Sequence, residues 1–292
     1  MTQSTGTIKQ EDKLSKKAAP FLEKGSASTQ YESKKNVTFF KSKCSVRVAN
    51  SPTLRKYAYE FIYKAYSKMG YTPNIKGEIW FSIHDAIPEA TTLIAENDHG
   101  DIAGALTIVF DSPIGLPADE LYGEEVGNLR KRRAKICEIV SFATNEEVRG
   151  SVRFVAGLFY SVYLLARKDQ GASDLIITVN NRQENFYCRN LMFDKIGSLK
   201  TYDKVNGAPA VLLRLDWELI DRQKKIQRIF PLSMFDYSSR EEAEIIQNLK
   251  DMMSPMSHDE FIDLLSRKPG IWERVTSAQK EYVLKQMMPW LK

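Results

Sequence analysis

Glu138 is the residue of this sequence that most needs a chemical explanation. It stands inside the apolar run "ICEIVSFA", where a carboxylate costs free energy unless it is paired, reached by water or used in a reaction. A carboxylate held on such a strand can remove a proton from an attacking nucleophile. It can equally form a structural ion pair, because the preceding run "LRKRRAK" supplies Lys131, Arg132, Arg133 and Lys135. The residues alone leave both interpretations open.

The run "LRKRRAK" is also the densest positive cluster of the chain. It is either a solvated surface or, through Lys131, Arg132 and Arg133, a docking surface for an acidic partner, because complementary charge speeds encounter and fixes orientation. Nucleic acid is not the expected partner, since that would require more such patches with interleaved aromatic residues.

The sequence indicates no metal site and no disulfide framework. The three histidines lie far apart and are expected at ordinary surface or turn positions, and the three cysteines form no C-x-x-C pair. These residues are His84, His99, His258, Cys44, Cys137 and Cys188. So few cysteines fit a reducing, intracellular setting.

Composition places the chain among globular proteins. Its 292 residues carry 42 Lys and Arg against 37 Asp and Glu, and the net charge of +5 mildly favours acidic partners. The hydrophobic fraction of 43% suffices for a folded core. No apolar run is long enough to span a bilayer, and the polar start "MTQSTGTIKQEDKLSKK" differs from a signal peptide. We expect a soluble, cytoplasmic protein.

The spacing of apolar residues predicts an α/β fold behind a flexible polar tail over residues 1–35. The expected elements, in order, are a strand near 37–48, an amphipathic helix that Ser51 caps and Gly70 ends, a hairpin over 91–112, a loop over 113–135, the strand that holds Glu138, a helix over 149–171, a buried strand "DLIITVN", a short helix "QENFYCRNLMF" and a hairpin that turns at Asn206 and Gly207. This order predicts a sheet that is antiparallel early and gains a parallel strand-helix-strand crossover in the middle.

Beyond Trp217 the chain is expected to be helical. The segments "SSREEAEIIQNLKDMM", "SHDEFIDLLSR" and "TSAQKEYVLKQMM" each begin with Ser or Thr followed three residues later by Glu or Gln, the signature of a capping box. We therefore divide the chain into the tail 1–35, an α/β domain 36–218 and a helical C-terminal region 219–292.

The order of these elements resembles the GNAT (N-acetyltransferase-like) fold. More narrowly, "GALTIVFDSPIGLPADELYGEEVGNLRKRRAKICEIVSFA" is similar to the corresponding region of the N-acyl amino acid synthase (FeeM-like) family, which is related to the acyl-homoserine-lactone synthases. The resemblance covers about Val37 to Trp217 and is most specific from Asp111 through Glu138. It implies a splayed mixed sheet flanked by helices, with a small all-helical C-terminal appendage.

The resemblance also implies an activity. The domain 36–218 is expected to move a long-chain acyl group from the phosphopantetheine thioester of acyl carrier protein to the amine of an amino acid. The strands "CEIVSFA" and "DLIITVN" would splay to admit the thioester arm, and Glu138 would be the catalytic base for the amine. Lys131, Arg132 and Arg133 would then dock the acidic carrier protein.

The expected phosphate loop departs from the pattern of coenzyme A users of this fold. They typically carry Q/R-x-x-G-x-G/A, whose backbone N–H groups hold the pyrophosphate. Here "RGSVRF" has Arg149 and Gly150 but no later glycine. This departure favours acyl carrier protein as the donor, with Arg149, Gly150 and Ser151 binding its single phosphate. An ordinary strand-to-helix turn is the alternative.

Tyr187 falls near the tyrosine that many fold relatives use to protonate the leaving thiolate, and it is the expected catalytic acid. Cys188 occupies the matching slot in another register, so the sequence does not decide between them. Where the homoserine-lactone relatives carry arginines, this chain has Thr107 and Ser141, which disfavours S-adenosylmethionine as acceptor. An aromatic group of residues is either core or the lining of an acyl tunnel: Tyr57, Tyr59, Phe61, Tyr63, Tyr66, Phe154, Phe159, Tyr160 and Tyr163.

The sequence thus predicts an N-acyltransferase with no tightly bound cofactor and no metal. Its co-substrate is an acyl-phosphopantetheine thioester, and its partners are acyl carrier protein and an amino acid. No transmembrane position is expected, and any association with a membrane surface would come through the lipid product. Two alternatives stay open: a non-catalytic acyl-carrier or lipid-binding scaffold, and an acyl-CoA-dependent N-acetyltransferase of the same fold.

Overall fold

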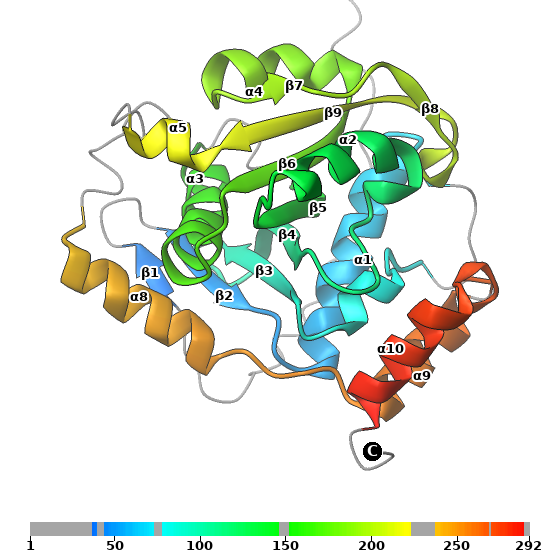
Figure 1. Cartoon of the computed structure of the whole chain (residues 1–292). Coiled ribbons are helices and arrows are strands. Elements are labelled where there is room, and N and C mark those ends of the chain that lie inside the picture. The colour runs from blue at the N-terminus through cyan, green and yellow to red at the C-terminus, as the bar shows by residue number, and fades with distance from the viewer. Residues whose placement is uncertain are drawn as a thin grey trace, which may run out of the picture. The chain divides into compact units, whose positions relative to one another are not determined.

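The computed structural model describes residues 37–39, 44–72, 78–145, 152–222, 237–268 and 270–288, all within the unit Lys35–Lys292 (Figure 1). The predicted tail over residues 1–35 and the predicted phosphate loop Arg149–Ser151 lie outside these ranges.

The described strands are β1 (Val37–Phe39), β2 (Cys44–Val48), β3 (Ala90–Glu96), β4 (Ile102–Phe110), β5 (Ile136–Thr144), β6 (Asp174–Asn180), β7 (Asp194–Lys195), β8 (Lys200–Tyr202) and β9 (Ala208–Asp216). The described α-helices are α1 (Pro52–Lys68), α2 (Asp119–Lys131), α3 (Val152–Val162), α4 (Glu184–Asn190), α5 (Trp217–Arg222), α8 (Ser239–Asp251), α9 (His258–Arg267) and α10 (Ser277–Met287). Shorter 3₁₀ turns are η1 (Ile83–Ala86), η4 (Asn181–Gln183), η5 (Asp203–Val205) and η6 (Trp272–Arg274), and the π-helical segment η3 (Tyr163–Asp169) continues α3.

The strands form one open, mixed sheet in the order β1-β2-β3-β4-β5-β6-β9-β7, with β8 paired to β9. Every strand pair among the described residues is antiparallel except β5 with β6. The chain runs from β5 to β6 through α3 and η3. Two parallel strands need such a crossover, because the chain must return to the end of the sheet at which the first strand began. The predicted order, antiparallel early with one parallel crossover, is confirmed.

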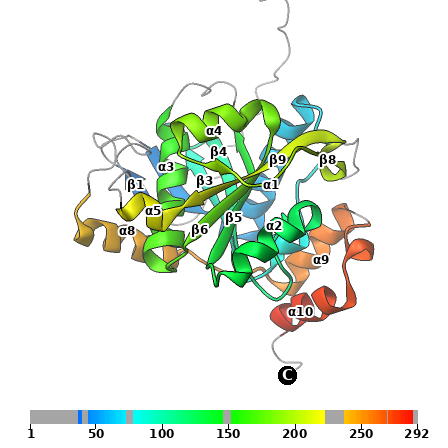
Figure 2. The ribbon, with the colours of Figure 1, turned by 45° about the horizontal axis from the view of Figure 1, so that its top comes forward.

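Helices cover both faces of this sheet (Figures 1 and 2). Leu158 of α3 packs in the cluster that contains Leu106 of β4, on the face called here the α3 face. The neighbouring Ala105 points the opposite way, where it packs with Ile62 of α1 on the α1 face. Val126 of α2 belongs to a further cluster on the α1 face. The strand β5, which holds Glu138, therefore lies between two helical layers.

The helix α2 corrects the sequence prediction, which treated residues 113–135 as a loop. Tyr122, Val126 and Leu129 follow one another at helical spacing and are buried against the sheet. Gly123 and Gly127 lower the intrinsic helix propensity of this segment. Neither glycine is required by close packing, because a Cβ at either position would meet no other atom within 4 Å. Tertiary packing of three apolar residues outweighs this weak local propensity.

The helix ends follow the predicted capping chemistry in most places. Ser51 caps α1 through the N–H of Leu54, and Gly70 follows the helix with a φ of 73°. Ser238 and Thr276 form full capping boxes at α8 and α10. At α9, Ser257 caps the helix, but the carboxylate that would complete the box is used elsewhere.

That carboxylate belongs to Glu260, which joins the C-terminal region to the sheet domain. Its two oxygens accept hydrogen bonds from Nε and Nη2 of Arg55 on α1, both at 2.6 Å, and both side chains are buried. Phe261 of α9 and Val283 of α10 pack with Phe81, beside η1. The helices α9 and α10 therefore extend the layer on the α1 face (Figure 2). None of the described helices combines the length and the apolar character that crossing a bilayer requires.

Candidate active site

The parallel strands β5 and β6 separate part-way along their length. They pair only from Ile136 with Asp174 to Ile139 with Ile177, although both strands continue beyond this point. A cavity of about 150 Å³ lies between the separated ends. Trp80, which packs in the cluster of the α1 face, and Phe159, which packs in the cluster of the α3 face, both line this cavity, so it passes through the sheet. The predicted V between these two strands is present.

A β-bulge in β5 accompanies this separation. The pairing of β5 with β4 shifts between Ala105 and Thr107, and Ser141 has a φ of 58°, which a non-glycine residue seldom adopts. Because an extra residue reverses the alternation of a strand, Phe142 turns to the α3 face, where its ring meets that of Phe159 at 5.5 Å between centroids. Both aromatic rings then line the cavity.

Glu138 is the second-last residue of β5 that pairs with β6, and its side chain faces the α1 side. Its side chain is 2% exposed and lines the cavity. Its Oε2 accepts a hydrogen bond of 2.9 Å from the N–H of Ala118, at the start of α2. Burial raises the pKa of Glu138 to about 8, while the Ala118 hydrogen bond and the charge of Lys204 oppose the rise. This pKa suits a base that works near neutral pH.

The ion-pair alternative for Glu138 finds no partner among the residues that the structure describes. No described cationic group lies within ion-pair distance of its carboxylate, and Lys131 instead donates to Asn128 Oδ1 at 3.2 Å. Lys131, Arg132 and Arg133 are exposed and end α2 just before β5. They therefore lie at the end of the sheet where β5 and β6 still pair, and they do not line the cavity.

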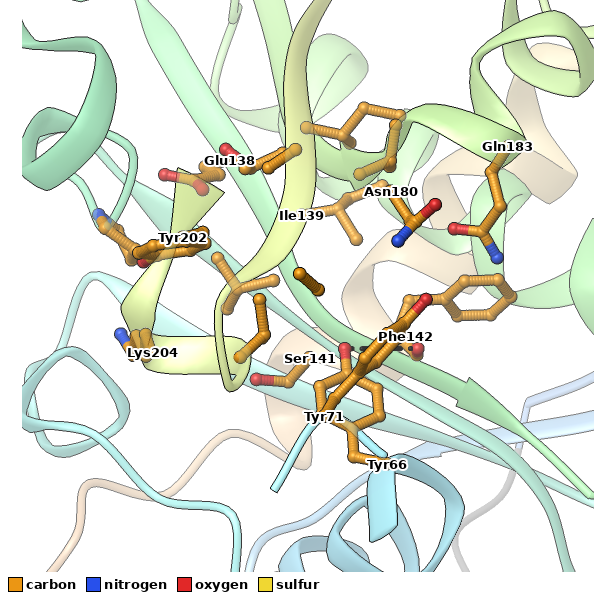
Figure 3. Close-up of a pocket in the computed structure, with 18 of the residues that line it drawn as sticks. Tyr66, Tyr71, Glu138, Ile139, Ser141, Phe142, Asn180, Gln183, Tyr202 and Lys204 are labelled. Atoms are coloured by element: carbon orange, nitrogen blue, oxygen red, sulfur yellow. Dashed lines mark hydrogen bonds between the residues drawn. The ribbon is translucent and has the colours of Figure 1, made fainter. Parts of the chain in front are cut away.

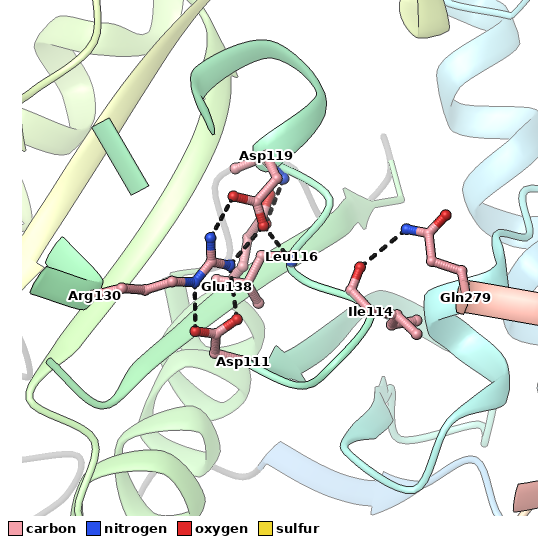
Figure 4. A network of polar contacts seen from close by, with 8 residues as sticks. Asp111, Ile114, Leu116, Asp119, Arg130, Glu138 and Gln279 are labelled. Carbon is pink, nitrogen blue, oxygen red and sulfur yellow. Dashed lines mark hydrogen bonds and ion pairs between the residues drawn. The ribbon is translucent and has the colours of Figure 1, made fainter. Parts of the chain in front are cut away.

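Arg130, from the same basic run, holds the loop that places Ala118 (Figure 4). Its guanidinium binds both oxygens of Asp111 at 2.7 and 2.8 Å and both oxygens of Asp119 at 2.6 Å. These residues stand at the beginning and the end of the loop between β4 and α2. Asp119 also accepts the N–H of Leu116 at 2.7 Å. The loop is thus fixed at both ends, and sequence reasoning missed this role of Arg130.

The C-terminal region supports the same loop. Gln279 of α10 donates from Nε2 to the carbonyl oxygen of Ile114 at 3.0 Å (Figure 4). Lys268, which follows α9, donates to the carbonyl oxygen of Phe81 at 2.9 Å and lies 4.8 Å from the ring centroid of Trp80, a cavity residue. Helices beyond the sheet domain therefore contact both segments that wall the α1 side of the cavity.

Tyr187 of α4 lines the cavity on its α3 side, whereas its neighbour Cys188 does not. Burial raises the pKa of Tyr187, so its hydroxyl keeps its proton in the resting enzyme. Tyr66 lies close enough to act on Tyr187 electrostatically, and it donates a hydrogen bond of 3.4 Å to the carbonyl oxygen of Phe142. Of the two candidates for the catalytic acid, the tyrosine is the one that faces the separated strands.

Only two of the expected aromatic residues, Tyr66 and Phe159, line the cavity. Most of the others are core, and Tyr57 is 44% exposed. His84 corrects a prediction, because it is buried in η1 rather than lying at the surface, and burial lowers its pKa to about 4. No cluster of three or more metal-binding side chains occurs among the described residues.

Sequence reasoning missed Tyr202 and Lys204, which reach the cavity from β8 and η5. They lie more than sixty positions beyond Glu138 in the sequence, and no local motif marks them. The only available signal was the hairpin itself, which turns at Asn206 and Gly207 with φ angles of 58° and 71°. This hairpin brings its side chains over the α1 side of the separated strands (Figure 3).

Comparison with known proteins agrees with this geometry. The family model "N-acyl amino acid synthase FeeM" matches residues 57–216, more than half of the chain. The chain belongs to the FeeM family of N-acyl amino acid synthases. The match ends with β9, so the helices α8, α9 and α10 lie beyond it. With a cavity between separated strands and a buried carboxylate in it, the chain is an N-acyltransferase of the GNAT fold.

Solved structures with the same fold include FeeM, an N-acyl amino acid synthase from uncultured soil microbes. It is 26% identical, with a TM-score of 0.53, and the match covers 62% of this chain and 98% of that chain. The acyl-homoserine lactone synthase LasI is 18% identical, with a TM-score of 0.44 and coverage of 59% and 89%. A GNAT-family acetyltransferase from Streptococcus pneumoniae is 14% identical, with a TM-score of 0.42 and coverage of 59% and 99%. No curated protein sequence matches the chain significantly.

Proposed function

We propose that this enzyme transfers a long-chain acyl group from the thioester of acyl carrier protein to the amine of an amino acid. The observation that carries the proposal is the place of Glu138, a buried carboxylate on the wall of a cavity that opens between two separated strands. A carboxylate kept there without an ion-pair partner costs stability, and acting as the base of the reaction accounts for its presence.

In the proposed reaction, Glu138 removes one proton from the substrate ammonium. The free amine attacks the carbonyl carbon of the thioester, so that a C–N bond forms and the C–S bond breaks. Tyr187 donates its hydroxyl proton to the leaving sulfur and recovers one from the nitrogen, which leaves a neutral amide and a thiol. Glu138 returns its proton to solvent, and the net products are one N-acyl amino acid, one thiol and one proton.

The separated strands also support an extended thioester arm. Beyond Ile139 and Ile177, β5 and β6 no longer pair with each other, so their facing backbone groups are available to the amides of a pantetheine. The apolar rings of Phe142 and Phe159 offer the acyl chain a site on the α3 side of the cavity. The sulfur would then lie near Tyr187 and the amine near Glu138.

Acyl carrier protein is the proposed donor because "RGSVRF" lacks the later glycines of a pyrophosphate loop. Arg149, Gly150 and Ser151 are proposed to bind the single phosphate of the carrier's arm. The test is to offer the enzyme dodecanoyl-carrier protein, dodecanoyl-CoA and dodecanoyl-pantetheine with a panel of amino acids, and to identify products by mass spectrometry. We expect the carrier-bound donor to give the highest kcat/KM. Equal or faster turnover of the coenzyme A thioester would refute the choice of donor.

Two exposed basic surfaces suit docking of an acidic carrier. One is the predicted run Lys131–Arg133, at the paired end of β5 and β6. The other is on η4 and α4, where Arg182 and Arg189 accompany Phe186, which is 51% exposed. The second surface is next to the cavity, because Gln183 and Tyr187 of the same segment line it.

Charge-reversal variants of each surface show which of the two docks the carrier protein. We expect Lys131→Glu with Arg132→Glu to slow transfer from the carrier protein but not from dodecanoyl-pantetheine, which lacks the carrier surface. The matched pair is Arg182→Glu with Arg189→Glu. A larger loss at this second pair would move the docking site to α4, and equal loss with both donors would assign the residues to the fold. Charge-guided docking also predicts a rate that falls with rising salt.

A further inference from the structure

The cavity has a marked charge asymmetry. Among the described residues that line it, Glu138 carries the one carboxylate and Lys204 the one cationic side chain. Figure 3 shows Lys204 and Tyr202 on the same side of the cavity as Glu138, with Asn180 and Gln183 across from them. Burial raises the pKa of Glu138, and the charge of Lys204 opposes this rise.

The ammonium of Lys204 has no counter-ion among the residues that the structure describes. No described carboxylate lies within ion-pair distance of it. The described carboxylates that act on it electrostatically are Glu138 and Asp85, and Asp85 is buried and already accepts hydrogen bonds from the N–H and the Oγ of Ser82. The α1 side of the cavity is therefore suited to an anion supplied by a ligand.

The surroundings hold Lys204 in place and strengthen this field. Asn206, two residues further on, donates from Nδ2 to the carbonyl oxygen of Gly70 at 3.2 Å, which ties the hairpin to the end of α1. Tyr202 donates to Glu120 Oε2 on α2 at 3.4 Å. A second cation, Lys268, lies behind the Trp80 wall, and burial together with the charge of Lys204 lowers its pKa to about 8. The two ammonium groups therefore act on the same region.

We propose that Lys204 binds the carboxylate of the acceptor amino acid and so makes the enzyme select amino acids over simple amines. An α-amino acid presents a carboxylate and an ammonium on one carbon atom. The cavity offers the complementary pair, a cation on the hairpin and a proton acceptor on β5. This inference rests on the proposed function and deepens it, because it names the chemical group that distinguishes the acceptor.

The kinetic test compares acceptors that differ only in the carboxylate. L-Phenylalanine is compared with 2-phenylethylamine, and L-leucine with 3-methylbutylamine, for the wild type and for Lys204→Met. We expect kcat/KM for the amino acids to fall about 10- to 100-fold, the usual worth of a hydrogen bond to a charged group, with most of the change in KM. Loss of the Lys204 charge also changes the ionisation of Glu138, which affects both acceptors alike. The informative quantity is therefore the ratio of kcat/KM for the amino acid to kcat/KM for its amine at one pH, which should fall about 10-fold or more in Lys204→Met and be partly restored in Lys204→Arg.

The matched control is Lys195→Met. Lys195 is an exposed lysine that pairs with Glu184 at 3.0 Å and does not line the cavity, so its loss should change neither acceptor. Equal loss with amino acids and amines at Lys204→Met would overturn the proposal, because it would assign Lys204 to the fold or to the chemistry. Unchanged selectivity would overturn it as well.

A binding measurement tests the proposal without turnover. Calorimetry compares N-dodecanoyl-L-phenylalanine with N-(2-phenylethyl)dodecanamide, which lacks the carboxylate. We expect the wild type to bind the acid more tightly and Lys204→Met to bind both alike. If the wild type makes no acyl product but shows this preference, the proposed function fails while the carboxylate site stands. If the wild type turns over but neither assay responds to Lys204→Met, the carboxylate site alone is refuted.

Discussion

Replacing Glu138 by Gln should make the protein more stable at high pH while making it inactive. The carboxyl group is buried, accepts one hydrogen bond from Ala118 and has a pKa of about 8, against an ordinary value of 4.5. The folded protein therefore holds a proton that the unfolded chain releases between those two values. The stability contributed by this group is present in full below the unfolded pKa and is lost as pH rises through the folded pKa. Gln cannot ionise, so Glu138→Gln lacks this loss.

The size of the effect follows from the pKa shift. A rise from 4.5 to about 8 corresponds to at most about 5 kcal/mol, since each pKa unit is worth about 1.4 kcal/mol. We expect the unfolding free energy of Glu138→Gln, relative to the wild type, to increase by about 2–5 kcal/mol between pH 5 and pH 9. Urea denaturation at the two pH values measures it, and the acyl-transfer rate should fall roughly a hundredfold or more.

Three outcomes of this experiment are informative. A stability difference that does not change with pH would refute the raised pKa of Glu138. A variant that gains stability and keeps its turnover would refute the role as base. A variant that loses stability at every pH would favour a structural ion pair that the described residues do not display.

Two further substitutions test the groups around Glu138. Tyr187→Phe should lower the rate roughly 10- to 100-fold with an alkyl thioester. The loss should be much smaller with an aryl thioester, because an aryl thiolate leaves without taking up a proton. Equal losses with the two donors in stopped-flow assays would exclude the acid role. Arg130→Lys cannot bind two carboxylates in bidentate fashion, so the loop that carries Ala118 should loosen. The pKa of Glu138 should then rise, and the rising limb of the pH–rate profile should move to higher pH; a lower rate with an unmoved profile would make Arg130 purely structural.

Much of the fold could be predicted from the sequence because its signals are local. Ser51 and Gly70 delimit α1 through capping chemistry, and Asn206 with Gly207 marks the last hairpin. The helix α2 could not be predicted in the same way, since Gly123 and Gly127 lower its helix propensity and the packing of its apolar residues against the sheet has no local signal. The positive φ of Ser141 has no local signal either, because it accompanies the bulge in the pairing between β4 and β5.

The residues of the candidate site likewise differ in whether the sequence carries a local signal for them. Glu138 could be found because a carboxylate inside an apolar strand is anomalous by itself. Tyr187 was found through a family resemblance, and the structure adds that it faces the cavity whereas Cys188 does not. Lys204 and Arg130 were missed as site residues, since each acts on groups that are distant in sequence and reach it only through the fold.

The most direct test of the account is a stoichiometric one. Purified enzyme is mixed with dodecanoyl-carrier protein and an amino acid, and the N-acyl amino acid and the free thiol are both quantified by mass spectrometry over the first turnovers. The account predicts one N-acyl amino acid for each thiol released, with both products nearly abolished in Glu138→Gln. Thiol released without amide would indicate a thioester hydrolase, and tight binding of the donor without either product would indicate a non-catalytic scaffold; either result would contradict the account.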